Sequence, residues 1–230
     1  LKYYVETADN RSSSLLQSAI DGVFSWAELN HMSLSISKCA VLKTRPDLTE
    51  YTLNGFPLPV VTSYRDLGVI MNSNLKFSDH ATSVVRSSSL ICNLILRCFI
   101  VRKPEFYVRL YRSLVEPRFL YCSPIWSPGL SGDRNRLEAV RRRFVRLVAS
   151  RCRLDRSEVD CLLDTVATLH CKADGRAMRR ILRSPNCSFF FNVKVTARRA
   201  GLLIQPLTRA RTNIVHNLFA WRVTRQHRLY

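Results

Sequence analysis

The chain has 230 residues, with 36 Lys and Arg against 17 Asp and Glu, and a formal net charge of +19. Its apolar fraction of 47% is that of a globular protein and excludes a disordered basic tail. Residues 1–80 carry seven basic and eight acidic residues, so the whole positive excess lies in residues 81–230. Because 29 of the 36 basic residues are Arg, whose planar group binds phosphate through paired hydrogen bonds, the composition favours a nucleic-acid partner.

Membrane and secreted classes are excluded by the apolar runs and the cysteines. The longest apolar run, Leu90–Val101, is interrupted by Asn93 and Arg97 and is too short to span a bilayer, so we expect no membrane partner. The start of the chain has no secretory signal pattern. The eight cysteines are spread singly, without a C-x-x-C pair, which predicts free thiols in a reducing compartment. We therefore expect an intracellular protein, with nucleus and cytoplasm not distinguished.

The first third of the chain predicts one helix followed by short strands. Ser14–Asn30 has helical apolar spacing, and Ser14 with Gln17 matches a capping box. The Asn54-Gly55 pair predicts a hairpin within Tyr51–Val61, whose two prolines confine its second strand to an edge. The apolar residues expected on one face of this helix are Leu16, Ala19, Ile20, Val23, Trp26 and Ala27. The other expected strands are Leu34–Ile36, Ala40–Leu42 and Tyr64–Met71.

From residue 79 onward the pattern becomes helical and basic. Scarce glycine, seven in the whole chain, agrees with this change. The expected elements are helices at Asp79–Val101 and Tyr107–Arg118, a loop or broken helix at Tyr121–Leu130, helices at Arg134–Arg151, Glu158–Cys171 and Ala173–Arg183, strands in Phe189–Phe191 and Val193–Val195, and a basic amphipathic stretch at Thr208–Arg228. We therefore predict a predominantly helical α+β fold with a small antiparallel sheet at the N-terminus.

A self-contained active site cannot be assembled from the motifs of the chain. The sequence has no nucleotide-binding glycine loop, no zinc-protease motif and no nucleophile elbow. Its acidic residues form no close pair of the kind that a two-metal site needs. Cys161, His170, Cys171 and Cys187 are spaced unlike a zinc knuckle, so we expect no metal site and no cofactor in this chain.

Arginines are densest between residues 134 and 146. Glu138 within this segment and Asp133 directly before it are too few acids to offset its charge through intrahelical pairs. Such self-repulsion favours a polyanionic partner over the alternative, a solvated helix face, and we expect the outer face of the helix to follow a phosphate backbone. The expected nucleic-acid-binding residues are Arg134, Arg136, Arg141, Arg142, Arg143 and Arg146.

Several segments match one family pattern in the order that the family has them. The most specific are Leu110–Pro117 and Leu120–Pro128. The others are Leu1–Tyr4, Leu15–Gln17, Met32–Cys39, Tyr64–Val69, Leu75–His80 and Leu137–Phe144, with fainter agreement at Ala210–Asn213 and Phe219–Val223. In these segments the chain resembles the C-terminal part of the reverse transcriptase of a non-LTR (LINE-type, jockey-like) retrotransposon. The resemblance covers nearly the whole chain and is strongest over residues 1–150.

The resemblance implies a division of roles along the chain. Residues 1–66 correspond to the end of the palm, 67–128 to a helical thumb, and 129–230 to a basic nucleic-acid-binding region. The implied function is that of a partial RNA-directed DNA polymerase that grips an RNA template and its cDNA or hybrid duplex. Two alternatives stay open: a non-catalytic basic nucleic-acid-binding module, and a non-functional remnant of an element.

Lys38 is the one catalytic candidate that the resemblance carries over to this chain. It matches the palm lysine that acts as a general acid toward pyrophosphate when the palm is intact. The family's catalytic carboxylates hold two Mg²⁺ ions and precede the segment that matches Leu1. The resemblance therefore implies that this chain lacks the catalytic carboxylates.

We predict that the purified 230-residue chain does not extend a primer on an RNA template with Mg²⁺ and dNTPs, because two-metal phosphoryl transfer needs those carboxylates. Extension is measured on a denaturing gel, with an active viral reverse transcriptase confirming that the primed template is usable. Synthesis by the chain alone would contradict the prediction.

Overall fold

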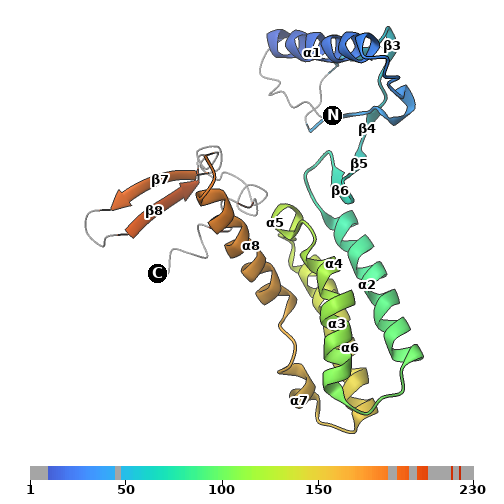
Figure 1. Ribbon diagram of the computed structural model, residues 1–230, viewed down its shortest axis with the longest axis vertical. Coiled ribbons are helices and arrows are strands. Elements are labelled where there is room, and N and C mark those ends of the chain that lie inside the picture. The colour runs from blue at the N-terminus through green and yellow to red at the C-terminus, as the bar shows by residue number, and fades with distance from the viewer. Residues whose placement is uncertain are drawn as a thin grey trace. The chain divides into compact units, whose positions relative to one another are not determined.

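The computed structural model describes residues 10–44, 48–185, 191–196 and 201–206, together with Phe219 and Val223. Side chains are described for all of these except residues 10–12 and the ranges 191–196 and 201–206. The chain forms two compact units, Leu1–Leu75 and Lys76–Tyr230, and Figure 1 shows the elements of each. The assignment of residues 1–66, 67–128 and 129–230 to three regions stays a prediction. The predicted boundary after residue 66 falls inside a hairpin, and the one after residue 128 falls inside the second unit.

Helix α1, Asn10–Leu29, is the main element of the first unit. It begins four residues before the predicted start, so Ser14 does not cap it. Gln17 instead bonds to the backbone of Thr52, donating to its carbonyl oxygen (2.9 Å) and accepting from its N–H (3.0 Å). The expected inner face is confirmed for Ala27, which is 2% exposed, whereas Trp26 is 57% exposed and does not belong to it.

Short strands in three pairs complete the first unit. They are β1 (Val41–Leu42), β2 (Thr52–Leu53), β3 (Phe56–Pro57), β4 (Val60–Val61), β5 (Ser63–Asp66) and β6 (Val69–Asn72). The β1–β4 pair is parallel, with Val41 opposite Val60, so this part of the expected antiparallel sheet is wrong. The strand expected at Leu34–Ile36 is also wrong, because Ile36–Lys38 forms a single 3₁₀ turn, η1.

Two hairpins turn through residues in the left-handed region. Asn54 (φ 51°) and Gly55 (φ 76°) join β2 to β3, which confirms the predicted hairpin and has the positive φ values of a type I′ turn. A second turn at Leu67 (φ 43°) and Gly68 (φ 89°) joins β5 to β6, where we predicted one continuous strand. Leucine rarely adopts positive φ, so the sequence carries a weak signal for this turn.

The described part of the second unit is a helical assembly with one hairpin. Its elements are α2 (Ser78–Cys98), α3 (Pro104–Leu114), α4 (Glu116–Leu120), α5 (Ser123–Trp126), α6 (Ser131–Cys152), α7 (Arg156–Asp160), α8 (Val166–Leu182), β7 (Phe191–Thr196) and β8 (Gly201–Pro206). The helices predicted from apolar spacing up to residue 152 are confirmed within a few residues at each end. The predominantly helical α+β class is likewise confirmed.

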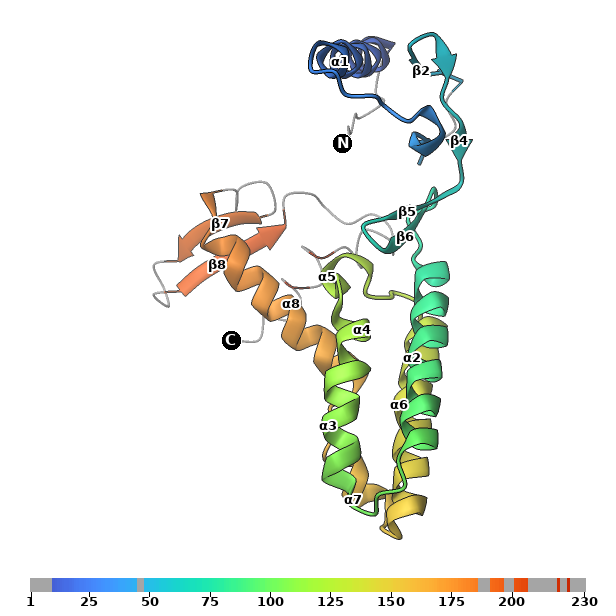
Figure 2. The same ribbon diagram turned by 45° about the vertical axis from the view of Figure 1, so that its right-hand side comes forward.

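Helices α2 and α6 run side by side in the same direction, and α3 returns antiparallel to both (Figure 2). Near the helix starts, Ser78 Oγ donates to Asp133 Oδ2 (2.7 Å); near the ends, Arg151 Nη1 donates to the carbonyl of Phe99 (2.7 Å). The core between them is aromatic: Tyr111 of α3 lies 4.8 Å from Phe144 of α6, centroid to centroid. The large side chains exposed by less than 2% are Trp126, Tyr107, Tyr111, Phe119, Phe144 and Leu137.

The chain after α6 differs from the prediction in its helix boundaries. Two helices were expected at Glu158–Cys171 and Ala173–Arg183, but α7 is short and α8 runs unbroken through Lys172. The hydroxyl of Thr165 caps α8 by accepting from the N–H of Thr168 (3.1 Å), which sets its start.

Strand β7 confirms the strand predicted at Val193–Val195, and it pairs antiparallel with β8, which we did not predict. Phe189, Phe190 and most of Thr208–Arg228 lie outside the described residues. In the last segment, Val223 is fully buried and packs with Phe219 against Met178 of α8.

Among the residues that the structure describes, no helix combines the length and the apolar character that crossing a membrane requires.

We predict that Phe144→Ala lowers the free energy of unfolding by about 3–5 kcal/mol, because a core aromatic leaves a cavity beside Tyr111. Leu147→Ala on the same helix is the matched control, with an expected loss below about 1 kcal/mol, since that side chain is 36% exposed. Urea unfolding followed by circular dichroism measures both, and equal losses in the two variants would contradict the packing described.

Candidate nucleic-acid interface

A small hollow lies between α2 and α6, on the side away from α3. Its lining residues are Ser89, Cys92, Asn93, Leu96, Val140, Arg143, Phe144 and Leu147. Phe144 contributes to the hollow and also contacts Tyr111 of α3, which places the opening opposite that helix. The hollow therefore has an apolar floor with polar groups of both helices beside it.

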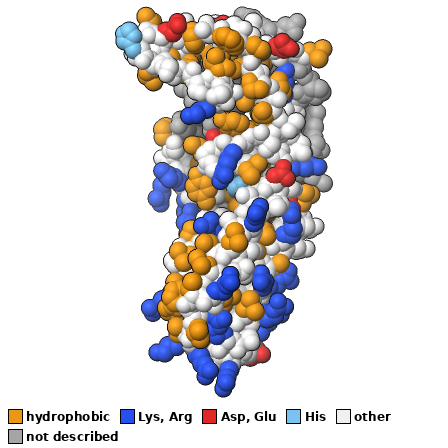
Figure 3. Space-filling model, turned by 90° about the vertical axis from the view of Figure 1, so that its right-hand side faces the viewer, with side chains coloured by type: hydrophobic (Ala, Val, Ile, Leu, Met, Phe, Trp, Pro, Cys, Tyr) orange, Lys and Arg blue, Asp and Glu red, His pale blue; other side chains and the backbone are white. Residues whose placement is uncertain are grey.

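Exposed arginines lie on both helices that form this hollow, and Arg143 is one of its lining residues. Arg142, Arg143 and Arg146 of α6 are exposed, and so are Arg86 and Arg97 of α2. None of these five forms an ion pair with a described residue, and the acidic side chains of α6 are engaged elsewhere. Figure 3 shows Lys and Arg side chains spread over this side of the second unit, between apolar patches. We call these five residues and the hollow the α2–α6 surface.

Arg136 lies beside the same surface and is partly committed to structure. Its guanidinium pairs with Asp133 and donates to Thr82 Oγ1 of α2 (3.0 Å), which joins the two helices. Its side chain remains 48% exposed. Arg136 and Arg143 are seven residues apart and so lie on the same side of α6, the side next to α2.

Arg141 does not lie on the outer face that we predicted. It is 4% exposed and pairs with Glu138 Oε1 (2.5 Å) and Asp160 Oδ1 (3.0 Å). Burial acts to lower the pKa of Arg141, but its bonds to the two carboxylates outweigh burial and raise it. The expectation that acids are too few for intrahelical pairing is wrong here, because Glu138 neutralises the one arginine that turns inward.

Arg134 is exposed, but on a different side of α6. It precedes Arg141 by seven residues and therefore lies on the same side as that buried arginine, away from α2. Of the six predicted binding residues, the structure thus places Arg136 and Arg143 on the side of α6 next to α2. Arg146 is exposed one turn after Arg143, Arg142 is exposed about 100° around the helix from it, and Arg134 and Arg141 lie on the side away from α2.

The thiol of Cys92 in the hollow is not a nucleophile. Burial, opposed only in part by the charge of Arg143, raises the pKa of Cys92 to about 12. At neutral pH the group stays protonated and serves as a small apolar side chain.

Among the residues that the structure describes, no cluster of three or more His, Cys, Asp or Glu side chains could hold a metal ion. Cys187, one of the four residues weighed for zinc, lies outside the described residues. His170, another of them, is bonded at both ring nitrogens, to Ser127 Oγ (2.9 Å) and to the carbonyl of Phe119 (3.0 Å). These bonds hold α8 against α4 and α5.

Lys38 lies in the first unit, at the end of turn η1, and its side chain is exposed. Its backbone carbonyl accepts a hydrogen bond from Tyr64 Oη (3.4 Å). The role that the resemblance implies for its amino group stays a prediction.

Sequence reasoning missed two sets of basic residues. One is the pair Arg86 and Arg97 of α2, which are isolated in sequence and join the others only because α2 lies beside α6. The other is on α8, at Lys172, Arg176, Arg179, Arg180 and Arg183, all exposed. Their spacing of three or four residues is the signal that could have found them.

Comparison with known proteins gives a distant link. No family model and no solved structure matches the chain. It is 28% identical over 95 residues to an uncharacterized protein of Caenorhabditis elegans, covering 41% of this chain and 48% of that protein. It is 25% identical over 144 residues to the RNA-directed DNA polymerase from mobile element jockey of Drosophila funebris, covering 60% of this chain and 16% of that polymerase. The chain thus spans less than half of either relative and is distantly similar to a non-LTR retrotransposon reverse transcriptase.

We predict that two adjacent arginines of α6 differ strongly in their contribution to stability. Arg141→Ala leaves Glu138 and Asp160 without their partner and is expected to cost about 2–3 kcal/mol of unfolding free energy, since both carboxylates keep some solvent contact. Arg142→Ala, the matched control, is expected to change stability by less than about 0.5 kcal/mol. Thermal and urea unfolding measure both. A stable Arg141→Ala variant would contradict the internal role of Arg141.

Proposed function

We propose that the α2–α6 surface grips the backbone of an RNA template paired with its DNA copy, as part of a reverse transcriptase of a jockey-like non-LTR retrotransposon. The observation that carries the proposal is the set of five exposed arginines on two adjacent parallel helices, none of which forms an ion pair with a described residue. Like charges on neighbouring helices repel one another, and a phosphate backbone supplies the opposite charge. The distant similarity to the jockey polymerase supports the choice of nucleic acid.

The contacts offered by this surface are to phosphate and sugar. Arginine side chains at its rim are long and flexible, and the floor is closed by Leu96, Phe144 and Leu147. Backbone contacts position a duplex without reading its bases, so the proposed grip has little sequence specificity. Such a grip suits a polymerase, which must hold every sequence that it copies.

The proposed division of roles follows the resemblance. We assign residues 1–66 to the end of the palm, 67–128 to the thumb and 129–230 to a basic nucleic-acid-binding region. In this assignment the chain contributes grip, while the two-metal chemistry belongs to carboxylates that precede the matched segment in the family. Lys38 then donates a proton to pyrophosphate only within an intact palm.

We predict that Arg142→Ala, Arg143→Ala and Arg146→Ala together weaken binding of an RNA–DNA hybrid and flatten its salt dependence. Removing three phosphate contacts lowers the slope of log affinity against log salt by about 2–3. Fluorescence anisotropy over a salt series, with the full chain and a labelled hybrid, measures the slope.

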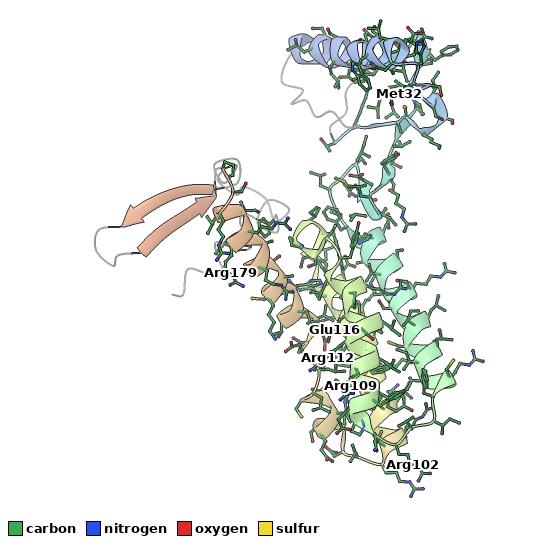
Figure 4. The ribbon with its side chains drawn as sticks, in the orientation of Figure 1. Met32, Arg102, Arg109, Arg112, Glu116 and Arg179 are labelled. Atoms are coloured by element: carbon green, nitrogen blue, oxygen red, sulfur yellow. The ribbon has the colours of Figure 1, made fainter. Side chains whose placement is uncertain are left out.

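A triple variant of exposed arginines outside this surface, with Arg109, Arg118 and Arg156 changed to Ala, is the matched control for total charge. Figure 4 labels Arg109 on α3, the helix on the far side of the core from the hollow. Equal losses in the two triple variants would contradict a localised interface. Equal affinity for the hybrid and for double-stranded DNA of the same sequence would contradict the reverse-transcriptase assignment and favour general backbone binding.

A further inference from the structure

Helix α8 carries a second row of basic side chains on one face. Arg176, Arg179 and Arg180 of α8 and Arg183, the residue directly after it, are exposed. The pairs Arg176–Arg180 and Arg179–Arg183 are each four residues apart, and Lys172 lies one turn before Arg176. His170 lies on the opposite face, where its bonds to Ser127 and Phe119 hold the helix on α4 and α5. The basic face therefore points outward, as Figure 4 shows for Arg179.

The charge of this face is not balanced within the described part of the chain. The one acidic residue of α8, Asp174, is fully buried and faces inward. Lys172 pairs with Asp164 (2.6 Å), whereas the four arginines form no ion pair with a described residue. The pairs Arg176–Arg180 and Arg179–Arg183 are like charges one turn apart, an arrangement that destabilises a helix at a cost to folding. An anionic partner would offset this cost.

The chemistry of the face selects the backbone of a duplex as that partner. Binding of single strands relies on aromatic side chains that stack on bases, and α8 contains no Phe, Tyr or Trp. A face that carries arginines and no aromatic side chain contacts the phosphate groups of a nucleic acid. From Arg176 to Arg183 the helix rises about 10 Å, which corresponds to about three phosphates at 3.4 Å per nucleotide.

The α8 face is separate from the α2–α6 surface. At the start of α8, the N–H of Val166 donates to Glu138 Oε2 (2.9 Å). Glu138 shares its side of α6 with Arg141, whereas Arg143 lies on the side next to α2. Both ribbon views place α3 between α8 and α2 (Figures 1 and 2).

We infer that α8 binds the phosphate backbone of a second duplex, so that the helical unit holds two nucleic-acid segments at once. The residues that carry this site are Arg176, Arg179, Arg180 and Arg183. Binding at α8 does not depend on the grip proposed for the α2–α6 surface, because a different helix and a different set of arginines form the site, whereas the total of two bound duplexes rests on that proposed function.

The test counts bound duplexes on the full chain. The probe is an RNA–DNA hybrid of about 12 base pairs, about 40 Å long at 3.4 Å per pair, titrated by isothermal calorimetry and weighed in complex by native mass spectrometry. We expect two hybrids on the native chain and one on the Arg176→Ser, Arg180→Ser, Arg183→Ser variant. The same three positions changed to Lys keep the charge and are expected to keep two.

Further measurements in the same experiment distinguish a failure of this inference from a failure of the proposed function. If changing Arg142, Arg143 and Arg146 to Ala leaves two hybrids bound while the α8 serine variant loses one, the α8 site stands and the α2–α6 grip fails. A single hybrid on the native chain, with no change in the α8 variant, would overturn the inference. Tighter binding of single-stranded RNA than of the hybrid at α8 would overturn it as well. Circular dichroism verifies that the serine variant keeps the helical content of the lysine variant.

Discussion

Burial of one face of α6 is the constraint on which the second unit depends. This 22-residue helix contains seven arginines, so it is stable only where its few apolar residues are covered by other helices. Phe144 and Leu137 meet this need against the core, with α2 on one side of the helix and α7 on the other. Each neighbour takes one side, and the remaining side is left to arginine. The position of the candidate binding surface therefore follows from packing. The apolar face of α6 is buried against other helices, and the arginines occupy the part of α6 that stays exposed.

Arginines of α6 lie in three different environments, and the local sequence does not distinguish them. Arg141 is enclosed and satisfied by two carboxylates and the carbonyl of Leu163. Arg151 closes the end of α2 by donating to the carbonyls of Leu96 and Phe99, and its guanidinium lies 5.9 Å from the ring centroid of Tyr107. Arg142, Arg143 and Arg146 remain at the surface. A planar group with five donors suits all three environments, so a run of arginines is not one functional unit.

Local patterns predicted the helices well and the pairings poorly. The stripe of Val140, Phe144 and Val148 repeats at helical spacing within a single segment, so the sequence alone was enough to place α6. The burial of Arg141 depends on Asp160, which lies 19 residues further on and comes close only when α7 packs on α6. In the first unit, the parallel pairing of Val41 with Val60 has no local signature at all, whereas Asn54-Gly55 does. Contacts between segments that are distant in sequence were thus not predicted, either for the fold or for the site.

The uneven distribution of charge also links binding to stability. Residues 76–230 hold 30 basic and 10 acidic residues, whereas residues 1–75 are close to neutral. Self-repulsion within the helical unit opposes its compact state, and any polyanion that binds the folded unit alone removes part of that repulsion. The stabilisation of the folded unit then grows with the logarithm of the ratio of ligand concentration to dissociation constant. Added salt has two opposing effects. Salt screens the repulsion in the free unit and at the same time weakens the complex. The helical unit is therefore expected to depend on nucleic acid most strongly at low ionic strength, where its own arginines repel one another most.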